Sequence, residues 1–221
     1  MNIYFELSIY SKMSQLTFHY GTMNSSKTAN LLMTAHTLRS QGKTVVLIKP
    51  SADDRDGADM IQSRVGLNAK ANIVLKPNNF PLDCAGPEEK SCGDLLESAD
   101  IILVDEAQFL SLENVEKLRY IASHDKIPVI CYGLLTDYRS KLFPGSKRLV
   151  ELCDQIKEVT YDVSPFLGDC CGCKGNKAII NSKFTIDCVG SHIIVRDGSQ
   201  EPDLGAEEKY KPLCWLCWSE S

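Results

Sequence analysis

Three features are missing from this 221-residue sequence, and each absence argues against a class of protein. No stretch approaches the roughly 20 apolar residues of a membrane-spanning helix. No block of basic residues occurs and the net charge is −5, so a nucleic-acid surface is not expected as the main functional feature. Residues 1–14 lack the basic flank and the apolar stretch of a secretory signal. We therefore expect a short N-terminal extension over residues 1–14 and a cytoplasmic protein.

Cysteine, by contrast, is abundant, with ten residues. Without a secretory signal, this number favours reduced thiols and a metal over a disulfide framework. Two C-x-x-C knuckles, Cys170–Cys173 and Cys214–Cys217, predict a tetrahedral zinc site that closes the long loop between them. The predicted ligands are Cys170, Cys173, Cys214 and Cys217, although Cys171 could replace Cys170. The remaining cysteines have no partner at ligand spacing: Cys84, Cys92, Cys131, Cys153 and Cys188.

A phosphate-binding loop is present, but it lacks its second glycine. An apolar run over residues 16–20 leads into a match to G-x-x-x-x-G-K-[ST], in which Ser26 replaces that glycine. The matching residues are Gly21, Thr22, Met23, Asn24, Ser25, Ser26, Lys27 and Thr28. Backbone N–H groups of such a loop bind phosphates, Lys27 would reach the outer phosphates, and Thr28 would hold Mg²⁺.

Ser26 adds a side chain where the backbone should approach the phosphates closely. We expect this crowding to weaken ATP binding. The alternative is that the Ser26 hydroxyl donates a hydrogen bond to a phosphate while the backbone keeps a right-handed conformation that serine tolerates.

Apolar runs alternate with helical patterns, which predicts an α/β fold with a parallel sheet. Strands are expected over residues 16–20, 44–48, 72–75, 101–105, 128–134 and 156–161. Helices are expected from the loop to Gln41-Gly42, near Leu95-Leu96, after a cap at Ser111 and over residues 149–152. Composition changes near Ser164, with β-like runs over residues 178–180 and 192–195. We predict a nucleotide-binding domain over residues 15–163 and a zinc-binding domain over residues 164–221.

The apolar strand over residues 101–105 ends in two carboxylates, Asp105 and Glu106. In a P-loop fold we expect this strand to lie beside the P-loop strand, so that Asp105 can hold Mg²⁺. Glu106 could accept a proton from an attacking hydroxyl. Two solvated acids at a strand end are the alternative. The Asp-Glu-Ala-Gln sequence also occurs in helicase-type ATPases, but those need two motor domains and a basic groove.

Residues 134–145 follow a buried strand and mix aromatic with basic side chains. This composition suits either a wall for a ring-bearing ligand or a plain surface loop.

These motifs together resemble the type II thymidine kinases, the zinc-containing class, from about Gln15 to Trp218. The resemblance rests on the P-loop with its methionine and on four further motifs. They are Asp53-x-Arg55, Ser63-Arg64-x-Gly66, Val104-Asp105-Glu106-x-Gln108-Phe109 and Tyr132-Gly133-Leu134-x-Thr136-Asp137-Tyr138-Arg139. The two knuckles complete it, with Lys209-Tyr210 just before the second.

The resemblance implies a P-loop parallel-sheet domain, a small zinc-stapled lasso domain, and transfer of the ATP γ-phosphate to the 5′-hydroxyl of thymidine. Glu106 would be the catalytic base. ATP would contact Gly21–Thr28, Arg55, Asp105, Glu106, Ala107 and Gln108, with Mg²⁺ at Thr28 and Asp105. Substrate would contact Met23, Phe109, Leu134, Tyr138, Phe143, Tyr210 and a lasso stretch formed by Glu201, Pro202, Asp203, Leu204 and Gly205. Members are commonly tetramers inhibited by the end-product triphosphate, and deoxyuridine is a possible second substrate.

Three departures from the family pattern leave an alternative open. They are Ser26, the acidic lasso segment Asp197–Gly205, and the unusual Cys-Cys-Gly-Cys of the first knuckle. A catalytically weakened nucleotide-binding relative would share the same motifs.

Overall fold

The computed structural model describes residues 15–53, 57–77, 80, 92–159, 170, 173, 176–186, 192–198 and 209–220. The predicted extension over residues 1–14, Arg55, the lasso stretch Glu201–Gly205 and Cys171 lie outside the described residues. Within the described part, no helix is both long and apolar enough to span a membrane.

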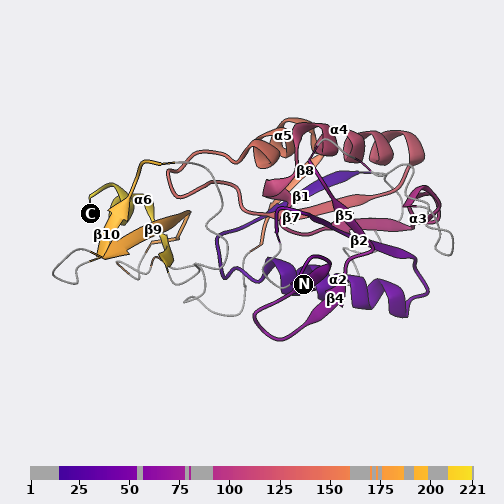
Figure 1. Ribbon diagram of the computed structural model, residues 1–221, viewed down its shortest axis with the longest axis horizontal. Helices are drawn as coiled ribbons and strands as arrows, with labels where there is room; N and C mark the ends of the chain where they lie inside the picture. Colours follow the sequence, from indigo (N-terminus) through magenta and orange to yellow (C-terminus); the bar gives the residue numbers. More distant parts are fainter. Residues whose placement is uncertain are drawn as a thin grey trace.

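A six-stranded parallel sheet forms the centre of the molecule and confirms the predicted α/β fold (Figure 1). Its strands are β1 (Leu16–Tyr20), β2 (Val45–Pro50), β5 (Ile73–Leu75), β6 (Ile101–Val104), β7 (Val129–Gly133) and β8 (Gln155–Glu158). Their order is β5-β2-β6-β7-β1-β8, and every neighbouring pair is parallel. Each strand was predicted from its apolar run, within one to three residues at the ends.

The expectation that β6 lies beside the P-loop strand β1 is wrong, because β7 lies between them. Parallel strands end at the same edge of a sheet, so the carboxyl ends of β1 and β6 still face the same side. The two motifs therefore meet because the helix that follows the loop carries Thr28 to Asp105, and not through direct strand pairing.

Helices cover both faces of the sheet (Figure 1). Helix α2 (Lys27–Ser40) packs on one face through the predicted stripe, and all four of its residues are buried: Leu31, Leu32, Ala35 and Leu38. Helices α4 (Leu112–Tyr120) and α5 (Pro144–Leu152) lie on the other face. The sheet strands alternate accordingly, with Leu47 and Leu103 towards α2 and Ile48 and Val104 in the opposite core.

The remaining elements near the sheet are short. Helix α3 (Cys92–Glu97), the 3₁₀ turn η1 (Ala107–Phe109) and the π turn η2 (Ile121–Asp125) connect the strands. The predicted cap of α4 is confirmed, since the Ser111 hydroxyl accepts a hydrogen bond from the backbone N–H of Asn114 at 3.2 Å. Helix α5 begins at Pro144, earlier than predicted. A hairpin of β3 (Met60–Gln62) and β4 (Asn68–Lys70) was not predicted.

A second, antiparallel sheet lies at one end of the molecule, beside helix α6 (Trp215–Ser219) (Figure 1). Its strands are β9 (Ile180–Ile186), β10 (His192–Val195) and β11 (Tyr210–Leu213), in the order β10-β9-β11. The run predicted over residues 178–180 only touches the start of β9, and β11 was missed. The boundary predicted at residues 163–164 falls outside the described residues and stays a prediction.

Candidate active site

The phosphate-binding loop follows β1 and turns sharply into α2. Asn24 and Ser26 both have left-handed backbones, with φ of 67° and 62°. A Cβ on Gly21 would lie 2.4 Å from the Ser25 hydroxyl oxygen and 3.2 Å from the carbonyl oxygen of Val159, so the loop packs closely around Gly21. Alternation of left-handed and right-handed residues turns successive N–H groups toward one point, as in an anion-binding nest. The alternative of a right-handed backbone at Ser26 is wrong, because this position keeps the conformation that glycine favours.

Lys27 lies across this loop. Its ammonium donates to the backbone carbonyl of Thr22 at 2.7 Å and to the Ser25 hydroxyl at 3.4 Å. The positive charge is therefore concentrated at the mouth of the loop, where the phosphates of a nucleotide would bind.

Thr28 and Asp105 bring the two sequence motifs together. The Thr28 hydroxyl, in the first turn of α2, donates to the Asp105 carboxylate at 3.3 Å. Asp105 directly follows β6, and its own N–H donates to the carbonyl of Ile48 at 2.9 Å. A hydroxyl and a carboxylate are the oxygen ligands that Mg²⁺ prefers, so this pair fits the predicted site.

Asp105 is almost completely buried. Burial, and then the negative charge of neighbouring Glu106, raise the pKa of the Asp105 carboxyl above its ordinary value. A cation held at this point would oppose both effects and favour the carboxylate.

Glu106 also has a left-handed backbone, with φ 47° and ψ 39°, a conformation uncommon outside glycine. Its side chain is half-buried. One carboxylate oxygen, Oε2, accepts a hydrogen bond from Nε2 of Gln108 at 2.5 Å. The other end of that amide, Oε1, accepts from the backbone N–H of Leu134 at 2.9 Å. The predicted base is thus connected to Leu134, a predicted substrate contact.

Four of the predicted substrate residues lie in two aromatic groups. Phe109 and Phe143 meet edge to face, with ring centroids 5.9 Å apart. Tyr138 and Tyr210 both lie near the ammonium of Lys183, which is 5.5 Å from the Tyr138 ring and 5.9 Å from the Tyr210 ring. Lys183 of the second sheet therefore lies close to Tyr138, within the segment of residues 134–145.

The second sheet also contacts the phosphate-binding loop. Asn181 of β9, which is buried, accepts a hydrogen bond from the backbone N–H of Met23 at 2.7 Å. Sequence reasoning missed Asn181 and Lys183. The only sequence feature that could have indicated these two residues is the presence of polar side chains in the run over residues 178–184. An ordinary surface strand has the same feature.

Residues after Leu134 make further contacts with the part of the chain around the second sheet. Arg139 pairs with Asp137 at 2.6 Å and donates to the carbonyl of Gly198 at 2.7 Å. The indole N–H of Trp218 donates to the carbonyl of Tyr138 at 3.2 Å. Gly198, just after β10, and Trp218 of α6 are therefore both attached to the segment after Leu134.

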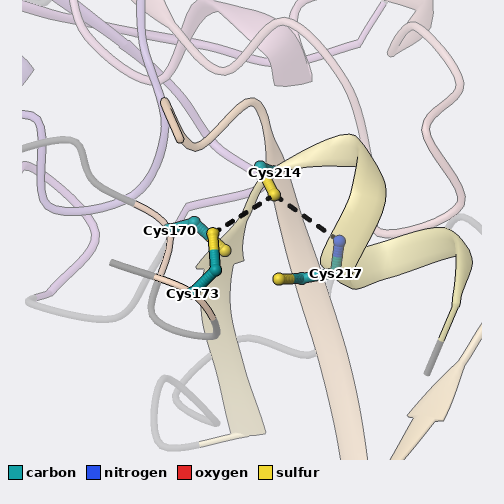
Figure 2. Close-up of side chains that lie close together, drawn as sticks. All are labelled: Cys170, Cys173, Cys214 and Cys217. Atoms are coloured by element: carbon teal, nitrogen blue, oxygen red, sulfur yellow. Dashed lines mark hydrogen bonds between the residues drawn. The ribbon is translucent and has the colours of Figure 1, made fainter. Parts of the chain in front are cut away.

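The predicted knuckle cysteines gather into one cluster (Figure 2). The sulfur atoms of Cys170, Cys173, Cys214 and Cys217 all lie within 4.8 Å of one another. Tetrahedral bonds of about 2.3 Å to zinc would place sulfurs about 3.8 Å apart. The Cys173 and Cys214 sulfurs are 3.8 Å apart. Cys170 lies in this cluster, whereas Cys171 falls outside the described residues, and the four thiols fit a structural zinc ion.

Fold and site together define a P-loop α/β protein with a nucleotide-type phosphate loop, an acidic pair at the sheet edge and a cysteine cluster suited to zinc. The sequence profile described as "Thymidine kinase" matches residues 14–218. The chain therefore belongs to the thymidine kinase family.

Individual relatives agree with this assignment. The chain is 38% identical to a thymidine kinase of Encephalitozoon cuniculi over 93% of its own length and 87% of that protein. It is 36% identical to a thymidine kinase of Rhizobium meliloti and 34% identical to one of Enterobacteria phage T4, each over 94% of this chain and 97% of the relative.

Among solved structures, the Pif1 helicase from Candida albicans matches with a TM-score of 0.39 and 14% identity. The match covers 75% of this chain and 40% of the helicase, and it carries no argument about function.

Proposed function

We propose that this chain is a thymidine kinase, which transfers the γ-phosphate of ATP to the 5′-hydroxyl of thymidine and makes dTMP for DNA synthesis by pyrimidine salvage. The observation that carries the proposal is the contact of Thr28 with Asp105. It joins the phosphate-binding loop to the acidic pair at one sheet edge, in a chain of the thymidine kinase family.

The ATP site proposed here is Gly21–Thr28 with Asp105, Glu106, Ala107, Gln108 and Arg55. Backbone N–H groups of the loop would hold the phosphate chain, and Lys27 would neutralise its outer oxygens. Bound between Thr28 and Asp105, Mg²⁺ would supply further charge neutralisation on the transferring phosphoryl group. Thr28 and Asp105 would hold that ion, and their oxygen atoms are already close together.

Glu106 is the proposed general base. Its carboxylate would accept the proton of the 5′-hydroxyl as that oxygen bonds to the γ-phosphorus and the bond from phosphorus to the β,γ-bridging oxygen breaks. ADP leaves with the electron pair of that broken bond. The Glu106 side chain is half-buried and lies beside the buried Gln108. It is therefore held in one orientation and is still open to the substrate.

The thymine base would lie among Met23, Phe109, Leu134, Tyr138, Phe143 and Tyr210, under the lasso stretch Glu201–Gly205. Two aromatic groups and the contact between Met23 and Asn181 support this placement. A pocket of this kind would bind deoxyuridine less tightly than thymidine, because deoxyuridine lacks the 5-methyl group.

We further propose a cytoplasmic homotetramer that is inhibited by the end-product triphosphate.

Transfer of label from [γ-³²P]ATP to a panel of nucleosides with Mg²⁺ tests the proposal. We expect labelled thymidine monophosphate as the main product, a smaller yield from deoxyuridine and none from purine nucleosides. ATP binding without transfer to any nucleoside would favour the alternative, a catalytically weakened nucleotide-binding relative.

A further inference from the structure

Gln108 uses both ends of its amide to connect two parts of the site. We propose that Gln108 is a positioning residue, which fixes Glu106 relative to Leu134 and thereby sets the distance from the base to the nucleoside. The inference rests on the proposed function, since it assumes that Glu106 is the base. The family resemblance places Gln108 only among the ATP contacts.

The chemistry of the two partners fixes the orientation of the amide. The backbone N–H of Leu134 can only donate, so it must face Oε1 of Gln108, at 2.9 Å. Nε2 then points to Oε2 of Glu106, at 2.5 Å, and donates to it. A flipped amide would place a donor against a donor and an oxygen against a carboxylate. Gln108 therefore holds Glu106 as an acceptor in one orientation.

Gln108 is buried, and close packing by its neighbours fixes its position. Its residue is 2% exposed. A Cβ on Gly133 would lie 2.7 Å from Oε1 of Gln108, and a Cβ on Gly145 would lie 2.9 Å from its carbonyl oxygen. The turn η1 that carries Gln108 is thus packed between β7 and α5 at two glycines. Such a tightly packed buried residue can hold a neighbour in place.

Both hydrogen-bond partners of Gln108, Glu106 and Leu134, are constrained by their surroundings. Glu106 has the left-handed backbone, which is unfavourable for residues other than glycine and persists only where the surroundings enforce it. Leu134 is held a second time, because its carbonyl accepts from the buried Ser146 hydroxyl at 2.5 Å. A continuous connection therefore runs from α5 through Leu134 and Gln108 to the carboxylate of Glu106.

Gln108→Met tests the proposal, since methionine has a similar shape but neither a donor nor an acceptor of comparable strength. A misplaced base costs on the order of 10- to 100-fold in kcat, and we expect that loss to exceed any change in KM for ATP or thymidine. ATP affinity measured by calorimetry should fall by less than kcat does, because the phosphate-binding loop would still hold the phosphates. Gln155→Met, which alters a glutamine on the edge strand β8, is the matched control and should behave as wild type.

A double-mutant cycle separates positioning from mere support of the fold. In a Glu106→Gln background, Gln108→Met should cost little further activity, because the group that it positions is already lost. Gln108→Glu keeps an acceptor for Leu134 but removes the donor to Glu106, and it should lose kcat to a similar extent. If Gln108→Met does not fold, the kcat of Gln108→Glu tests the proposal instead.

Three results would overturn the proposal: full kcat in Gln108→Glu, weaker ATP binding in Gln108→Met as the main defect, or additive losses in the cycle. Failure of the proposed function would look different, because the wild-type protein itself would then transfer no label from ATP to thymidine.

Discussion

Ser26 keeps the backbone of a glycine while carrying a side chain. Its φ of 62° places it in the left-handed region, where a Cβ costs about 1–2 kcal/mol. Ser26→Gly removes that strain and opens the loop to phosphates, at the expense of a more flexible unfolded chain. We therefore predict tighter ATP binding, a severalfold fall in Kd by calorimetry, with the free energy of unfolding nearly unchanged.

Asn24→Gly is the matched control, because Asn24 is also left-handed, with φ 67°, but is exposed and tolerates this region better. A loss of ATP affinity specific to Ser26→Gly would instead show that the serine hydroxyl is an adapted phosphate contact.

His19 on β1 makes stability depend on pH. Burial, and then the positive charge of Lys157, lower the pKa of His19 from 6.5 to about 4. Nε2 is buried and has no hydrogen-bond partner within the described residues, and the ring packs edge to face on Tyr132. Below pH 6.5 the unfolded chain binds a proton that the folded protein refuses, so stability falls as the pH falls towards 4.

His19→Phe keeps a ring against Tyr132 and removes this titration. Between about pH 7.5 and about pH 5, wild type should lose about 2 kcal/mol of unfolding free energy more than the variant. Urea unfolding at several pH values measures this difference. Equal pH dependence in the two proteins would rule out a buried neutral His19.

The identity of the site residues was easier to predict than their contacts. The residues Lys27, Thr28, Asp105 and Glu106 carry local motif signals, and the structure places Thr28 against Asp105. Gln108 appeared in a motif, but its partner Leu134 lies 26 positions away along the chain. Such long-range contacts leave no spacing signal, and so a sequence does not reveal them.

At the scale of elements, the strands that could be predicted from the sequence are those with a high content of apolar residues. The central strands are apolar on both faces because helices cover both sides of a parallel sheet, and their runs are easy to recognise. The hairpin β3–β4 and strand β11 are short, half-exposed and rich in polar residues, and β11 contains Pro212. The prediction missed most of strand β9 because polar residues interrupt it from Asn181 onward and its second half is partly exposed.

The cysteine cluster joins β11 and α6 to the segment before β9. We predict one zinc ion per chain in freshly purified, reduced protein, and loss of zinc in Cys173→Ser and Cys217→Ser. The second sheet should then loosen, with faster amide hydrogen exchange in β9 and β11. Cys92→Ser is the control, since Cys92 lies in α3 outside the cluster. Elemental analysis that finds no zinc in wild type would contradict the assignment.

At the scale of the whole molecule, the second sheet contacts both the phosphate-binding loop and the segment after Leu134. Asn181 contacts the phosphate-binding loop, and Lys183 lies beside Tyr138. Loss of zinc should therefore weaken thymidine binding as well as stability, because strand β9 carries both contacts and leads directly from the first knuckle.

The central claim is that the acidic pair at the end of β6 completes a phosphotransfer site with the P-loop, and Glu106→Gln tests it most directly. We predict that the variant folds and binds ATP like wild type, because glutamine keeps the shape and Asp105 still meets Thr28. Label transfer from [γ-³²P]ATP to thymidine should fall by roughly 100-fold or more, the scale of a general base. Wild-type transfer by Glu106→Gln, at unchanged ATP affinity, would contradict the account.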